Sequence, residues 1–143
     1  MSNPGSLDAL LGDEERHATF HDAVLTGVQI DYLVKRFVGD LQLCVGDLNA
    51  SDEAERERRR RGQLVVEDLS VWALEPPGVN ASGVDDDGLW LSADGLLAEA
   101  PTDAGRTLAR GVKSNQAGRF LFFFSNLNAF AYLAGGRFEF HWS

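Results

Sequence analysis

The stretch from Gln63 to Leu74, QLVVEDLSVWAL, decides the fold, because it alternates apolar and polar side chains with the two-residue period of a half-buried β-strand. The apolar positions are even at first and odd later: Leu64 and Val66, then Leu69, Val71 and Ala73. One extra residue near Glu67-Asp68 would bring both halves onto a common inner face, which is the effect of a β-bulge. The sequence therefore predicts a bent strand, ended by the prolines at positions 76 and 77.

Further strands are expected on both sides of this stretch. The alternation recurs over Ala23–Tyr32 with Val28, Ile30 and Tyr32 on one face, over Leu41–Val45, and over Arg137–Trp142 with Phe138, Phe140 and Trp142 on one face. The run Phe120–Phe124 is apolar throughout, which is typical of a strand buried on both faces. Asp94-Gly95 lies between short apolar runs and predicts a two-residue hairpin turn.

About two or three short helices are expected beside these strands. Within residues 1–19, a turn over Leu7–Leu11 between Ser6 and Gly12 predicts a docking helix or a frayed tail. Residues 51–61 carry acid-first pairs four residues apart but almost no apolar face, so we expect a helix-compatible, solvated charged excursion. Asp103–Arg110 predicts a short helix inside an otherwise irregular acidic segment, residues 78–118. Residues 126–134 fit either a helix or a continued strand.

These elements predict one domain over residues 1–143, with a mainly β fold of the β-rich α+β class. The antiparallel sheet is expected to curl into a sandwich or a partly open barrel. The late aromatic residues, which include the Phe120–Phe124 run, would fill its core or line a cavity for an apolar ligand.

The chain of 143 residues is acidic, with 22 acids, 13 bases and a formal net charge of −9. A field of this sign repels phosphate backbones and anionic lipids, so neither nucleic acid nor a membrane is expected as a partner. A protein partner would be basic, and a homo-oligomer is a further expectation. The single cysteine, Cys44, and the absence of secretory signal features near Met1 favour the cytoplasm.

Catalytic signatures are absent: the sequence contains no nucleophile elbow, no phosphate-binding loop and no dinucleotide fingerprint. His17 and His21 stand four residues apart, and with Asp22 and His141 they form the one candidate set for a metal-dependent enzyme. Their spacing lacks the glutamate that makes a His-Glu-x-x-His helix specific for zinc. We therefore expect no metal, no cofactor and no catalytic residue.

A non-catalytic protein-binding module is the function that these observations favour. The candidate contact residues are Asp85, Asp86, Asp87 and Trp90, which lie in the irregular acidic segment. Two alternatives remain, a small barrel that binds an apolar ligand and the metal-dependent enzyme built on His17, His21, Asp22 and His141.

The sequence also resembles a group of small uncharacterised bacterial domains. The resemblance rests on Phe20-His21-Asp22-Ala23 leading into a strand, on the stretch FFFSNLNAF at 122–130, and on the final Phe138-x-Phe140-x-Trp142. Some of these similar proteins are thought to be immunity partners of secreted toxins. The resemblance implies an acidic, β-rich, cytoplasmic and non-catalytic module, and it assigns no functional residue.

Overall fold

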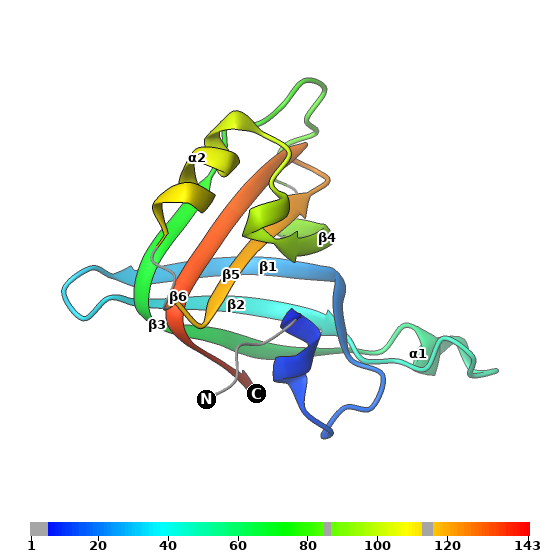
Figure 1. Cartoon of the computed structure of the whole chain (residues 1–143). Coiled ribbons are helices and arrows are strands. Elements are labelled where there is room, and N and C mark those ends of the chain that lie inside the picture. Colours follow the sequence, from blue (N-terminus) through cyan, green and yellow to red (C-terminus); the bar gives the residue numbers. More distant parts are fainter. Residues whose placement is uncertain (1–5, 85–86, 113–115) are drawn as a thin grey trace.

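The computed structural model describes residues 6–84, 87–112 and 116–143, in which six antiparallel strands form a closed barrel (Figure 1). The strands are β1 (Thr19–Asp31), β2 (Arg36–Cys44), β3 (Arg59–Leu74), β4 (Leu89–Leu96), β5 (Gly118–Phe124) and β6 (Ala129–Trp142). Their order around the barrel is β1-β2-β3-β6-β5-β4, and β4 closes the ring by pairing with β1. The mainly β, antiparallel fold class is confirmed.

The bulge expected in β3 is present. The register of β3 against β6 shifts between Leu69 and Val71, and Asp68 adopts a φ of +53°. Two glycines of β6 allow this close approach: a Cβ on Gly135 would lie 2.3 Å from the Val66 side chain, and one on Gly136 would lie 2.7 Å from Asp68 Oδ2. Because of this bend, the long strand β3 pairs with β2 before the bulge and continues along β6 after it.

The bulge does not return both halves of β3 to one inner face, and that expectation is wrong. Leu64, Val66 and Trp72 face the barrel interior, whereas Val71 and Ala73 pack outside it. The physical reason is that a helix covers the outer face of β3 beyond the bulge, so both faces of this part of the strand are partly buried.

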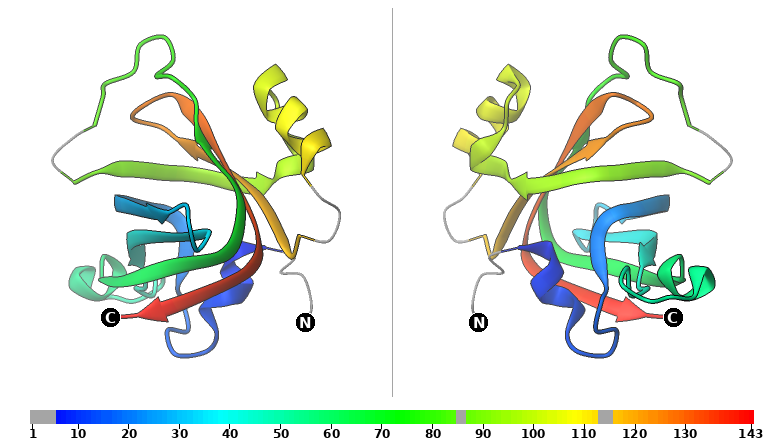
Figure 2. Two further views of the ribbon diagram at one scale, coloured as in Figure 1. Left: turned by 90° about the vertical axis from the view of Figure 1, so that its left-hand side faces the viewer. Right: turned by 90° about the vertical axis from the view of Figure 1, so that its right-hand side faces the viewer.

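That helix is α2 (Asp103–Gly111), which confirms the prediction over Asp103–Arg110 and lies outside the barrel against the sheet (Figure 2). Thr102, rather than Asp103, caps it by accepting a hydrogen bond from Gly105 N at 3.0 Å. The second apolar core beneath it contains Leu97 of the 3-10 helix η2 (Leu97–Glu99), together with Ala100, Leu121 and Tyr132.

Aromatic side chains fill the barrel interior. Phe20, Phe37, Phe120 and Phe124 are among the largest fully buried side chains. The cavity that remains between them is about 20 Å³, which is room for about one water molecule. The late aromatics therefore build a packed core in this structure.

The N-terminal segment is a docked helix rather than a frayed tail. The 3-10 helix η1 (Leu7–Leu11) lies at the lower end of the barrel in Figure 1 and buries Leu7 and Leu11 in the main core. Asp8 fastens it to β1 by accepting hydrogen bonds from Phe20 N at 2.9 Å and Thr19 Oγ1 at 3.0 Å.

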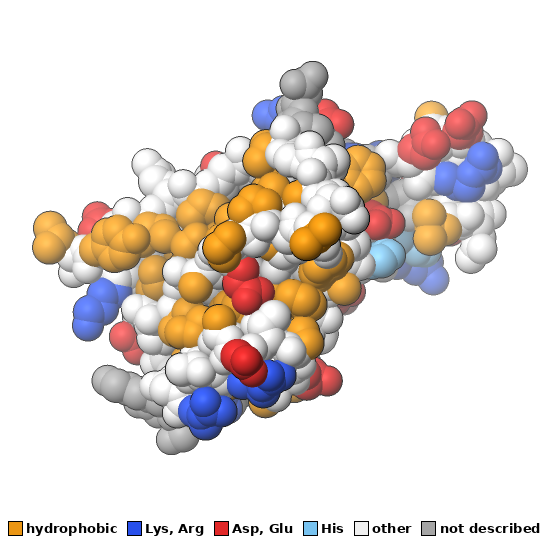
Figure 3. Space-filling view, turned by 90° about the horizontal axis from the view of Figure 1, so that it is seen from above, with side chains coloured by type: hydrophobic (Ala, Val, Ile, Leu, Met, Phe, Trp, Pro, Cys, Tyr) orange, Lys and Arg blue, Asp and Glu red, His pale blue; other side chains and the backbone are white. Residues whose placement is uncertain are grey.

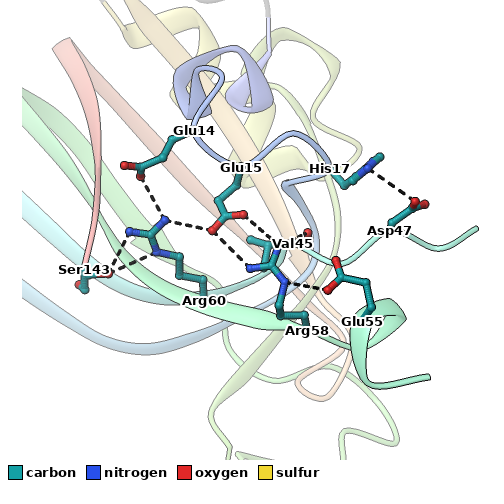
Figure 4. Close-up of polar contacts among 9 residues, drawn as sticks. All are labelled: Glu14, Glu15, His17, Val45, Asp47, Glu55, Arg58, Arg60 and Ser143. Carbon is teal, nitrogen blue, oxygen red and sulfur yellow. Dashed lines mark hydrogen bonds and ion pairs between the residues drawn. The ribbon is translucent and has the colours of Figure 1, made fainter. Parts of the chain in front are cut away.

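A charged network holds the residues after η1 against the barrel (Figure 4). Arg60 Nη1 lies 3.0 Å from Glu15 Oε2, and Arg58 Nη2 lies 3.1 Å from Glu15 Oε1. Hydrogen bonds from these two arginines hold the pKa of Glu15 below its ordinary value. Residues 51–61 are therefore not wholly a solvated excursion: α1 (Glu53–Arg56) is short, and β3 begins at Arg59.

Two further local expectations differ from the structure. Asp94 and Gly95 do not form a turn but lie inside β4, where Asp94 pairs with Phe122 of β5. Of the two alternatives for residues 126–134, the continued strand is correct, because β6 starts at Ala129 after a turn. In both places a neighbouring strand supplies main-chain partners that a local pattern does not reveal. Within the residues that the structure describes, no helix is long and apolar enough to cross a membrane.

Candidate protein-binding surface

The turn between β1 and β2 presents three consecutive large apolar residues to solvent, two of which, Leu33 and Tyr32, are the most exposed large apolar residues that the structure describes. Tyr32 is 81% exposed, Leu33 95% and Val34 61%. Figure 1 shows this turn projecting beyond the barrel on the side away from α1. A cluster of large apolar side chains held in water is typical of an interaction surface.

Asp31 shapes this turn. Its Oδ1 accepts hydrogen bonds from Leu33 N at 2.9 Å and from Val34 N at 3.1 Å, and Lys35 closes the turn with a φ of +56°. An aspartate that caps the amides two and three residues later forms a local turn without tertiary support. The apolar tip is therefore presented in a defined conformation.

A groove runs from the tip toward α2. Its volume is about 310 Å³, and its lining comes from the hairpin, from β3 and from α2: Ile30, Tyr32, Leu69, Ser70, Val71, Trp72, Ala73 and Leu108. In Figure 3 hydrophobic side chains form a band from the projecting tip across the middle of the face seen from above. Groove and tip together are called the apolar face here.

A second hollow lies on the hairpin itself. It has a volume of about 580 Å³ and is lined by Gln29, Ile30, Asp31, Tyr32, Leu33, Val34, Arg36 and Val38. Ile30 and Tyr32 line both hollows, so the hairpin contributes to each of them. The face that carries Val28, Ile30 and Tyr32 was expected to be buried, but it is largely exposed because the hairpin extends past the barrel end.

Charges of both signs lie next to the apolar face. Asp31, Asp68 and Glu75 take part in no ion pair within residues 6–84, 87–112 and 116–143, whereas Glu67 is paired with Arg36 at 3.1 Å. Lys35, in the turn of the hairpin, is a cation without an ion-pair partner among the described residues. Arg110 on α2 stands two positions after Leu108, so the two side chains lie on different faces of the helix.

Tyr132 links the groove to the outer core. Burial is the main cause that raises the pKa of its phenol, which therefore stays protonated at neutral pH. It donates a hydrogen bond to Glu75 Oε1 at 3.0 Å, and Thr102 Oγ1 lies 2.6 Å from the same hydroxyl. These contacts hold Glu75 beside the end of β3.

Asp87 and Trp90, the predicted contact residues that the structure describes, do not line the apolar face. Asp85 and Asp86 fall outside the described residues, and Asp87 is exposed. Trp90 is 37% exposed, and the Arg59 guanidinium lies 5.9 Å from the centre of its ring. Asn126 fixes this strand start by accepting from Trp90 N at 3.1 Å and donating to Gly88 O at 2.8 Å. These contacts therefore hold Trp90 in place at the start of β4.

The predicted metal ligands are not brought together. His17 faces Asp47 at 3.8 Å, His21 faces Asp22 at 3.6 Å, and His141 faces Glu139 at 3.1 Å. Within the described part of the chain, no three His, Cys, Asp or Glu side chains lie close enough to hold a metal ion. Burial raises the pKa of Cys44, which does not favour a reactive thiolate.

Sequence reasoning missed the apolar tip. The signal was present, since Tyr32-Leu33-Val34 places three apolar residues between two strands, where turn residues are usually polar. The alternation of Val28, Ile30 and Tyr32 assigns Tyr32 to an amphipathic strand, and this assignment conceals the exposed turn. No protein-family model, no curated protein and no solved structure matches the chain.

Proposed function

We propose that this protein is a non-catalytic binding module that holds a basic protein partner on its apolar face. The observation that carries the proposal is the exposed tip, Tyr32, Leu33 and Val34, which Asp31 presents in a fixed conformation. A preorganised apolar tip loses little conformational entropy on binding, which is a property of interface residues.

Charge supports a basic partner. The chain carries a net charge of −9. Asp31 lines the hollow on the hairpin, Asp68 and Glu75 stand at the two ends of the Leu69–Leu74 part of β3, and none of the three has an ion-pair partner in the part of the chain that the structure describes. A field of this sign accelerates encounter with a cationic protein and slows encounter with an anionic one. The resemblance to immunity-like bacterial domains is in keeping with such a partner and with a cytoplasmic setting.

Neither alternative function has comparable support. The interior cavity of about 20 Å³ is far below the roughly 300 Å³ at which ligand pockets begin, so it does not favour an apolar-ligand barrel. The three histidines face three different carboxylates, so they do not favour a metal-dependent enzyme.

Site-specific photo-crosslinking in the native host tests the proposal. A benzophenone amino acid placed at Leu33 should give a discrete adduct with a basic protein. The matched control is the same amino acid at Leu48, which is also apolar and 80% exposed. Leu48 belongs to the segment between β2 and α1, and Figure 1 shows α1 on the opposite side of the barrel from the hairpin turn. The absence of an adduct at Leu33, or the same adducts at both positions, would contradict the proposed function.

A further inference from the structure

The groove of the apolar face runs along an unpaired strand edge. β3 pairs with β2 from Arg59 to Glu67, where Glu67 lies opposite Arg36. It then turns away at the bulge, after Leu69 N donates to Lys35 O at 2.9 Å. From there to Leu74 its one strand partner within the described residues is β6.

The phase of the β3–β6 ladder shows which main-chain groups face the groove. Glu75 N donates to Phe130 O at 2.9 Å, so this pair is a hydrogen-bonded one. Because hydrogen-bonded and non-bonded pairs alternate along an antiparallel ladder, Ala73 and Val71 also point their main-chain groups at β6. The N–H and C=O groups of Trp72 and Leu74 therefore point to the opposite, unpaired edge.

Apolar side chains border this edge on both sides. Ile30 and Tyr32 of the hairpin lie on one side, and Leu108 of α2 lies on the other. A strand edge set in an apolar groove binds extended peptides, since the main chain supplies hydrogen bonds and the walls select side chains. Edges left open to solvent are instead usually blunted by charge or proline.

We propose that β3 accepts an extended segment of the partner protein as an added strand along Ser70–Leu74. This inference rests on the proposed function and specifies how the partner is held. The segment would place apolar side chains at alternate positions against Ile30, Tyr32 and Leu108, and would carry Lys or Arg where it passes Asp68 and Glu75.

A second copy of the chain is the less favourable occupant. Two copies would bring net charges of −9 together and would place Asp68 and Glu75 of one edge beside those of the other. A basic segment would instead be attracted by both carboxylates.

A proline substitution separates strand addition from other modes of binding. The amide of Leu74 points away from β6, so Leu74→Pro removes an edge donor without removing a hydrogen bond of the β3–β6 ladder. The matched control is Leu74→Ala, which keeps the amide and shortens the side chain. Unfolding curves of both variants establish that the barrel is retained.

The probe is a phage-displayed library of random dodecapeptides selected on the full chain. Enriched peptides should bind the Leu74→Pro variant about tenfold more weakly, the loss expected for one or two main-chain hydrogen bonds, and should bind Leu74→Ala nearly as well as the unaltered chain. One enriched peptide should also slow amide hydrogen exchange at Trp72 and Leu74 of the unaltered chain, a measurement that needs no variant.

Three results would overturn strand addition: no enriched peptide, equal binding by the proline variant, or unchanged exchange at Trp72 and Leu74. A Leu33 crosslink whose yield is undiminished in the Leu74→Pro variant would also overturn strand addition while leaving the proposed function in place. The absence of any crosslink from position 33 in the chain that keeps Leu74 would contradict the proposed function itself.

Discussion

Truncating Leu7 to alanine tests whether η1 is an integral part of the fold. Leu7 is 0% exposed, and η1 cannot settle freely into the resulting cavity because Asp8 holds it to Phe20 N and Thr19 Oγ1. Leu→Ala changes at buried sites cost about 2 to 5 kcal/mol, less where the surroundings can relax. A five-residue surface helix can relax in part, so we expect a loss of about 3 kcal/mol in the free energy of unfolding.

The assay is urea unfolding at neutral pH with the same truncation at Leu33 as the matched control. At a slope of about 2 kcal/mol per molar urea, the midpoint of the Leu7→Ala variant should fall by about 1.5 M. Leu33 is 95% exposed, so Leu33→Ala should change stability by less than about 0.5 kcal/mol. A loss below about 1 kcal/mol at Leu7, or equal losses at the two positions, would refute the assignment of η1 to the core.

Three further predictions use the same unfolding assay. Gly135→Ala should cost about 2 to 3 kcal/mol, because the new Cβ would lie 2.3 Å from the Val66 side chain; an unchanged midpoint would contradict the tight β3–β6 crossing. Glu15→Gln should destabilise the protein at neutral pH, and the difference in stability from the unaltered chain should shrink in acid. The pKa of Glu15 is lowered in the folded state, so its carboxylate stabilises the fold fully above the ordinary pKa of 4.5. This stabilisation disappears as the pH falls through the pKa of the folded state. A loss of stability that does not change with pH would show that the ionised carboxylate of Glu15 is not its cause. Replacing residues 52–57 with a Gly-Ser link should leave the melting temperature within a few degrees, whereas extending the replacement through Arg61 should abolish cooperative unfolding, because β3 begins at Arg59. Equal tolerance of both replacements would show that Arg58 and Arg60 do not anchor the N-terminal segment.

The candidate site was harder to predict than the fold. Composition and motifs pointed to binding rather than catalysis, but the predicted contacts around Trp90 rested only on the irregular pattern and the acidity of the segment 78–118. The apolar tip could have been found from Tyr32-Leu33-Val34. The groove could not, because Ile30, Trp72 and Leu108 are far apart in sequence and meet only when the hairpin, β3 and α2 are assembled.

The sequence by itself determined the features that depend on local pattern. The two-residue period over Gln63–Leu74 specifies a strand, because a strand exposes successive side chains on opposite faces. Its slip of phase coincides with the position of the bulge, but the later apolar positions Val71 and Ala73 pack outside the barrel. The continuous apolar run Phe120–Phe124 likewise specifies a strand covered on both faces, which the barrel interior and α2 provide.

Only the tertiary structure decided how the strands are joined and what the bend leaves open. Asp94-Gly95 has the sequence of a turn, yet it lies within β4 because β5 offers a ladder of main-chain partners there. Val71 and Ala73 pack outside because α2 covers them, and Trp72 and Leu74 present an open edge because β2 does not follow β3 past Glu67. Each outcome depends on which distant segment lies alongside, and a strand carries no local record of its neighbour since main-chain hydrogen bonds are the same for every sequence.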